Sequence, residues 1–188
     1  PVAERNGSFV GGKFEQYQRL PYLAWTQVFT ELVYQLLTWS DADLAQWRQA
    51  IQIAVGENGR LLTDLIPHLE LVVGPQSEVA PLEGREAQHR LEFTLRSFIA
   101  ALATAEHPLV VVLDDLQWAD AASLNLMNLL LAEPPLDHLL IVGVYRDAEI
   151  LPEHPLRLML SALEQAGTPI VTLLLAPLNQ ADINRLIA

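Results

Sequence analysis

The sequence predicts an α/β fold, a doubly wound parallel β-sheet with helices on its faces. Uncharged runs rich in Val, Leu and Ile occupy residues 109–113, 139–145 and 170–175, and such runs are typical of strands buried on both faces of a parallel sheet. Stretches with helical spacing alternate with these runs, as in doubly wound folds. Two adjacent acids, Asp114 and Asp115, follow the first run, at the edge where open α/β sheets bind ligands.

The first half, residues 8–105, is predicted to hold one strand and a helical region. Ser40 with Asp43 has the spacing of a helix N-cap and its partner. The charged residues of the longest helix are expected mainly in solvent; they are Arg85, Glu86, Arg90, Glu92 and Arg96. The expected elements are a strand at 8–10 ending in two glycines, helices at 25–39, 41–55, 61–66 and 86–105, and a surface loop at 74–84.

The second half, residues 106–188, is predicted to alternate strands with helices. Trp118 is expected to pack beside the strand in a mostly structural loop. Pro155 suits the first helical position and Gly167 the helix stop, and Asn179 with Asp182 has the spacing of a further cap. The expected elements are strands at 109–113, 139–145 and 170–175, helices at 121–131 and 155–166, and a last helix that begins after Asn179.

Composition limits the functional classes. The chain has 188 residues, 51% of them hydrophobic, a net charge of −12 and no cysteine. An acidic protein is unsuited to nonspecific nucleic-acid binding, which depends on neutralising phosphates. No apolar run reaches the length of about 18 residues needed to cross a bilayer. We therefore expect a cytoplasmic globular domain with no disulfides and no membrane insertion, and the first residue, Pro1, suggests a piece of a longer protein.

The acids after the 109–113 run have two interpretations. In the functional one they form a Walker B element, in which Asp114 holds Mg²⁺, through a water, and Asp115 polarises an attacking water. In the structural one Asp115 or Asp120 merely caps the next helix. Arg146, directly after the 139–145 run, either reaches a γ-phosphate or forms a salt bridge with Asp115, Asp147 or Glu149.

Residues 7–13 fit the spacing G-x-x-x-x-G-K of a phosphate-binding loop, and Lys13 is the only lysine of the chain. A true phosphate loop follows a strand, opens a helix and places Ser or Thr after the lysine. Here the preceding residues are polar, Phe14 replaces the hydroxyl and Pro21 interrupts any helix. We therefore expect a turn at this position, not a phosphate site.

The stretches LVVVLDDLQWADAASLNLMNLL and LLIVGVYRDAEI resemble the AAA-type ATPase module of STAND-class signalling proteins. The module is similar to that of bacterial multidomain serine/threonine and sensor histidine kinases. The likeness extends to GGKFEQYQRLPYLAW, LIPHLELVVGPQ and LLLAPLNQADINRLI. The resemblance implies a P-loop NTPase-like sheet, with ATP and Mg²⁺ as ligands and Arg146 in the sensor-1 position.

The resemblance also implies that the chain starts after Walker A, so that residues 1–188 are a partial nucleotide-binding domain with a helical insertion. In the family the Walker A strand lies between the strands that correspond to 139–145 and 170–175. Buried unpaired backbone groups cost about 1–3 kcal/mol each. We therefore expect the piece alone to be unstable, to self-associate through the gap, or to close 139–145 against 170–175, and to bind ATP weakly or not at all.

Two functions remain open at the level of the sequence. The first is an ATP- and Mg²⁺-binding regulatory switch, with slow hydrolysis in the intact parent, that signals to adjacent kinase or sensor domains. Asp115 stands where typical AAA enzymes have Glu, which leaves its catalytic competence open. The second is a non-catalytic scaffold for protein–protein interaction.

Overall fold

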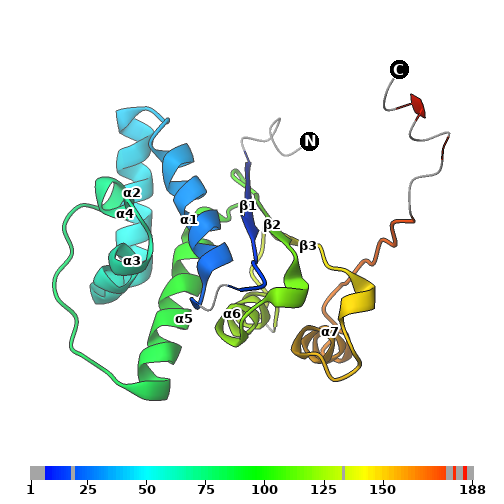
Figure 1. Cartoon of the computed structure of the whole chain (residues 1–188). Helices are drawn as coiled ribbons and strands as arrows, with labels where there is room; N and C mark the ends of the chain where they lie inside the picture. The colour runs from blue at the N-terminus through cyan, green and yellow to red at the C-terminus, as the bar shows by residue number, and fades with distance from the viewer. Residues whose placement is uncertain (1–6, 18–19, 133, 177–179, 181–183, 186–188) are drawn as a thin grey trace.

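In the computed structural model, three parallel strands form the centre of the molecule (Figure 1). The structure describes residues 7–17, 20–132, 134–176, 180, 184 and 185. Within these, the strands are β1 (Ser8–Lys13), β2 (Leu109–Asp114) and β3 (Leu139–Gly143), in the order β1-β2-β3. Lys13 is paired with Asp114 and Leu113 with Gly143, so all three strands end at one edge of the sheet. The predicted α/β class with flanking helices is confirmed.

The first strand is longer than the sequence suggested. Gly11 and Gly12 belong to β1, where we expected them to end it. Gly12 permits the close approach of helix α1 (Leu23–Leu36), because a Cβ at this position would collide with the backbone carbonyl of Ala24. The contact fixes the end of β1, and with it Lys13, against the helix.

Polar side chains of α1 cover the outer edge of β1. Gln27 accepts a hydrogen bond from the Lys13 amide at 2.8 Å and Glu31 one from the Gly11 amide at 2.9 Å. Gln35 donates to the carbonyl of Phe9 at 3.0 Å. The three helical residues are four apart, which places them on one helix face. Because they bond three of the outward-facing backbone groups, they hinder the pairing of another strand with β1.

A helical layer follows α1, to the left of the sheet in Figure 1. As predicted, Ser40 caps α2, accepting from the Asp43 amide at 3.3 Å. Residues 74–83 have no regular structure, as expected of the predicted loop. The short helix α4 was not predicted. The bounds are α2 (Asp41–Val55), α3 (Gly59–Leu65), α4 (Leu69–Val73) and α5 (Gly84–Leu102), with a 3₁₀ turn at Gly56–Asn58.

The aromatic side chains of α1 belong to the core, as their helical spacing predicted. Trp25 stacks on Phe29 at a centroid distance of 5.7 Å, and Phe29 meets Phe98 of α5 edge-on at 5.9 Å. The prediction that the charges of α5 lie in solvent is wrong for Glu92, which is 8% exposed. Its carboxylate accepts hydrogen bonds from Gln88 at 2.8 Å and from the Tyr22 hydroxyl at 3.4 Å, which satisfies it inside the protein.

Helices α6 (Ala121–Leu131) and α7 (Pro155–Gln165) lie below the sheet in Figure 1. Both match their predicted ranges to within one residue. Asp120 caps α6, accepting from the Ser123 amide at 2.9 Å, so the structural interpretation holds for this acid. A 3₁₀ turn at Leu116–Trp118 follows β2, and another at Asp147–Glu149 follows β3.

The prediction of a strand at 170–175 is wrong. These residues have no regular structure, and residues 171–175 are exposed, Leu174 at 88% and Leu175 at 86%. A strand needs a partner that accepts its hydrogen bonds, and within the described residues no strand pairs with the free edge of β3. The expected closure of β3 against this segment is therefore not seen. Asn179 and Asp182, the predicted cap of a last helix, lie outside the described residues.

Candidate functional site

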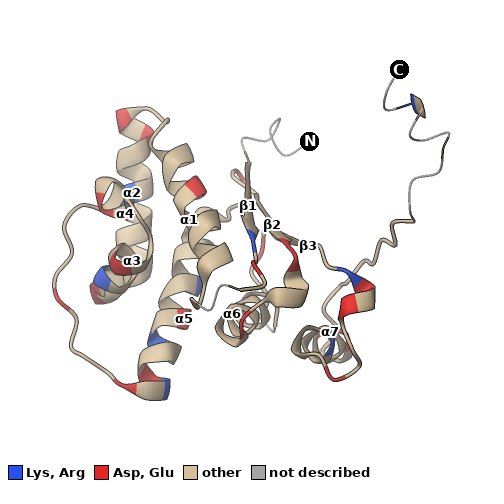
Figure 2. Cartoon of the chain, viewed as in Figure 1, with Lys and Arg blue, Asp and Glu red and all other residues tan. Residues whose placement is uncertain are grey.

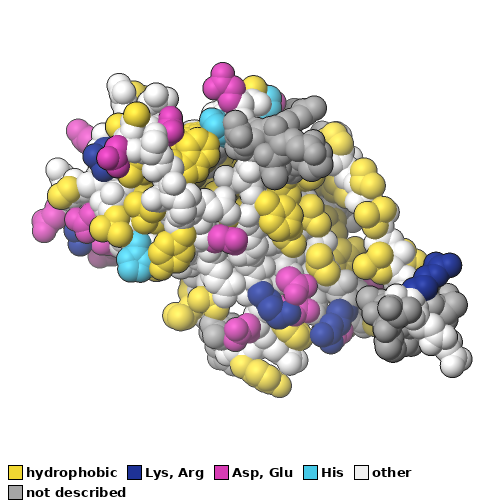
Figure 3. Space-filling view, turned by 90° about the horizontal axis from the view of Figure 1, so that it is seen from above, with side chains coloured by type: hydrophobic (Ala, Val, Ile, Leu, Met, Phe, Trp, Pro, Cys, Tyr) yellow, Lys and Arg dark blue, Asp and Glu magenta, His cyan; other side chains and the backbone are white. Residues whose placement is uncertain are grey.

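Four charged residues meet at the carboxyl edge of the sheet. Lys13 ends β1, Asp114 ends β2, Asp115 follows it, and Arg146 lies three residues beyond β3. Figure 2 shows the basic end of β1 beside the acidic end of β2, and Figure 3 shows basic and acidic side chains in contact on the surface. The three residues predicted as the site, Asp114, Asp115 and Arg146, are therefore brought together, and Lys13 joins them.

Asp114 keeps a side chain that solvent reaches. It is 44% exposed, and its Oδ1 accepts the amide hydrogen of Asp115 at 2.9 Å. Its Oδ2 lies 2.9 Å from the Lys13 ammonium. A partly exposed carboxylate at a strand end is a suitable hard-oxygen ligand for Mg²⁺, which needs one or two such ligands beside phosphates and waters.

Asp115 is by contrast enclosed. Its side chain is 9% exposed, and its backbone has a φ of 55°, in the left-handed region that few side chains adopt. Oδ1 accepts from Gln117 at 2.8 Å and lies 3.8 Å from Nε of Arg146, and Oδ2 is 2.6 Å from Lys13. The hydrogen bonds from Lys13 and Gln117 hold the pKa of this carboxyl below its ordinary value. Asp115 is therefore an ionised acid fixed in position, and it does not cap α6.

Arg146 makes two of the three ion pairs that the sequence offered. Its Nη1 lies 3.0 Å from Glu149, and its Nε approaches Asp115. Asp147 pairs with Arg157 at 3.0 Å instead. The Arg146 guanidinium also lies over the ring of Trp118, 5.7 Å from the centroid. With a side chain that is 62% exposed, Arg146 is held by surface contacts that a ligand can replace.

Gln117 is a site residue that the sequence analysis treated as part of a structural loop. It is 6% exposed. Its amide donates to Asp115, and its Oε1 accepts from the Arg146 amide at 3.3 Å. Its own carbonyl lies 3.1 Å from Nε2 of His154, whose Nδ1 accepts the Leu156 amide and so leaves Nε2 as the donor. Gln117 thus connects the acids to the start of α7.

Lys13 is the other residue that the sequence analysis missed. It was considered only as the lysine of a phosphate loop, and a turn was expected there instead. The expected turn is wrong, since residues 8–13 are an extended strand. Its raised pKa follows from its hydrogen bonds with Asp115 and Asp114. The pairing of parallel strands could have indicated its role, because a lysine that ends one strand lies beside the acid that ends the neighbouring strand.

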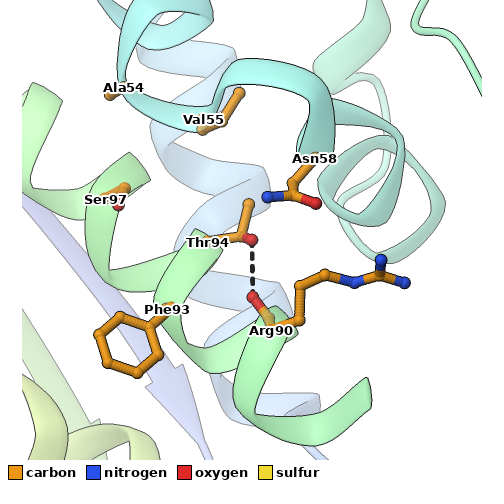
Figure 4. A pocket seen from close by; sticks show the side chains of 7 residues that line it. All are labelled: Ala54, Val55, Asn58, Arg90, Phe93, Thr94 and Ser97. Carbon is orange, nitrogen blue, oxygen red and sulfur yellow. Dashed lines mark hydrogen bonds between the residues drawn. The ribbon is translucent and has the colours of Figure 1, made fainter. Parts of the chain in front are cut away.

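The carboxylates of Asp114 and Asp115 are hard-oxygen groups of the kind that could hold a divalent metal together with other ligands. Within the described residues, no group of three or more His, Cys, Asp or Glu side chains that could hold a metal ion is found. A hollow of about 120 Å³ lies elsewhere, in the helical layer, where Arg90, Asn58 and Thr94 are among its lining residues (Figure 4). No helix in the described part of the chain is long and apolar enough to cross a membrane.

Comparison with known proteins identifies the class. A family model described as "AAA ATPase domain" matches residues 2–142. The chain therefore belongs to the AAA ATPase domain family, which confirms the predicted AAA-type module and implies nucleotide binding in general.

A curated relative is hybrid signal transduction histidine kinase G of Dictyostelium discoideum. It is 35% identical over 123 residues, which are 65% of this chain and 4% of the relative. The chain thus spans a small part of that multidomain protein, and the match supports the predicted signalling context. No solved structure matches significantly.

Proposed function

We propose that this domain is an ATP- and Mg²⁺-binding switch of a larger cytoplasmic signalling protein. The observation that carries the proposal is the geometry at the carboxyl edge of the sheet, where two acids and two cations meet in an AAA ATPase domain. Neighbouring kinase or sensor domains of the same polypeptide would receive the signal. The name of the Dictyostelium relative supports that context.

Each residue has a role that its surroundings support. Asp114, partly exposed, would hold Mg²⁺ through a water, and Asp115, enclosed and ionised, would orient the attacking water. Arg146 would leave Glu149 to face the γ-phosphate. Bound Mg²⁺ would neutralise phosphate charge. Because Asp is shorter than Glu, Asp115 reaches less far toward the nucleotide, and we propose slow hydrolysis suited to a switch.

The phosphate cradle would come from a Walker A segment upstream of Pro1, whose strand pairs with β3. The two edges of the sheet support this arrangement. Gln27, Glu31 and Gln35 block β1, whereas no strand in the described part of the chain pairs with the outer edge of β3. The sheet face at β3 is also partly uncovered, with Leu140 56% and Val142 39% exposed. The exposed segment 170–175 would then pair with the far side of the added strand.

The test compares Mg²⁺-ATP binding by calorimetry in two polypeptides. One is residues 1–188, and the other adds roughly 60 upstream residues, enough for a strand, a loop and a helix. We expect binding only by the longer one, lost in Asp114→Asn and kept in the matched control Asp64→Asn, whose acid pairs with Arg60 in the helical layer. Absence of binding by both polypeptides would leave the protein-interaction scaffold as the function.

A further inference from the structure

Lys13 occupies the position between the two acids. Its ammonium lies 2.9 Å from Oδ2 of Asp114 and 2.6 Å from Oδ2 of Asp115. The other oxygen of each acid already has a protein partner, because Asp114 accepts the Asp115 amide and Asp115 accepts Gln117. The two Oδ2 atoms are therefore the ones available to an added cation, and the lysine faces both.

We propose that Lys13 is a tethered counter-ion of Asp114 and Asp115 that Mg²⁺ must displace, so that it sets how strongly nucleotide binding depends on the metal. The proposal rests on the proposed function, since it concerns the same acids. It makes Lys13 a positioning residue: the ammonium keeps the acid pair neutralised and in place between nucleotide-bound states.

The backbone of Lys13 is held in place and its side chain reaches solvent, as displacement of the ammonium requires. The backbone is fixed, because the Lys13 amide donates to Gln27 and the residue is in register with Asp114. The side chain is 56% exposed on a flexible four-carbon stem. The ammonium can therefore leave the acids for solvent or phosphate without moving β1, while Gln117 and Arg146 stay beside Oδ1 of Asp115.

Charge also favours displacement over coexistence. With Lys13 and Arg146 in place, the two acids already face two cations. A divalent ion bound beside the ammonium would be repelled by it, since like charges a few ångströms apart disfavour each other. Removing the lysine charge therefore removes both a competitor and a repulsion, and both effects act in the same direction on metal binding.

The experiment measures ADP affinity by calorimetry in the full-length protein, once with Mg²⁺ and once with EDTA. The ratio of the two affinities is the metal enhancement. In Lys13→Met we expect this enhancement to rise roughly two- to fivefold, the range for partly exposed ion pairs. Lys13→Arg, which keeps the charge, should stay near wild type. Arg60→Gln is the matched control, because it removes one positive charge from a surface pair remote from the site.

Unchanged enhancement in Lys13→Met would overturn the proposal. If both affinities fell by a similar factor, which leaves the ratio unchanged, Lys13 would bind phosphate directly. A wild-type protein that binds no nucleotide under either condition would overturn the proposed function instead.

A second measurement needs no variant. The reactivity of the Lys13 amine toward an acylating reagent, followed by peptide mass spectrometry, should increase when Mg²⁺-ADP binds, because the ammonium leaves its acids. A decrease would overturn the proposal.

Discussion

Gly12→Ala gives a sharp test of how β1 and α1 are packed. A Cβ at this position would collide with the carbonyl oxygen of Ala24, lie 2.8 Å from its carbonyl carbon and 3.1 Å from a methyl group of Val28. The obstacle is mainly helix backbone, so α1 must shift. Overpacking of this kind costs about 1–3 kcal/mol. The shift would also lengthen the bond between Gln27 and the Lys13 amide.

Gly11→Ala is the matched control on the same strand. The nearest atom to a Cβ there is the Val112 carbonyl oxygen at 3.7 Å, an ordinary contact. Both substitutions reduce the conformational entropy of the unfolded chain to the same extent, which stabilises the folded protein by about 0.4–1 kcal/mol. The difference between the two variants therefore isolates the steric cost, about 1–3 kcal/mol. Urea unfolding of the longer polypeptide, followed by tryptophan fluorescence, measures it; equal midpoints for both variants would refute the packing argument.

Three further predictions concern the core, the sheet edge and the acids. Trp25→Ala, at a fully buried position, should destabilise the domain by about 3–5 kcal/mol in urea unfolding. Gln27→Ala should speed hydrogen exchange of the Lys13 amide, because it removes the acceptor at 2.8 Å, and an unchanged rate would contradict the blocked edge. The pKa of Asp115 is lower in the folded protein than in the unfolded chain, where it is about 3.9. The ionised carboxylate therefore stabilises the fold at pH values above about 3.9, and this contribution is lost as the pH falls through the pKa of the folded state. The stability difference between wild type and Asp115→Asn should accordingly be present at pH 7 and vanish at lower pH.

Local signals in the sequence were sufficient to predict most of the helices, with the short helix α4 as an exception. The ranges of α2 and α6 match the prediction at both ends, because Ser40 and Asp120 supply caps that depend on residues three positions away. The spacing of α1 likewise identified Trp25 and Phe29 as core residues. Caps and amphipathic faces act within a few residues, so a single sequence contains them in full.

Strand pairing was harder to predict from the sequence. The run at 170–175 has the composition of a buried strand yet lies exposed, because pairing depends on a partner and on no property of the run itself. Composition also failed to distinguish Glu92 from its solvated neighbours, since the Tyr22 hydroxyl that satisfies it is 70 residues away along the chain.

By itself, the sequence determined the α/β class, most of the helix positions, the placing of Asp114 and Asp115 at the end of β2 and the placing of Arg146 shortly after β3. These follow from periodicity and from the rule that parallel strands present their carboxyl ends at one edge. Only the tertiary structure decided that Lys13 lies between the acids, 101 residues from Asp114, and that Gln117 holds Asp115. The physical reason is that ion pairs and buried hydrogen bonds depend on register and distance, which strand pairing and packing set only once the chain has folded.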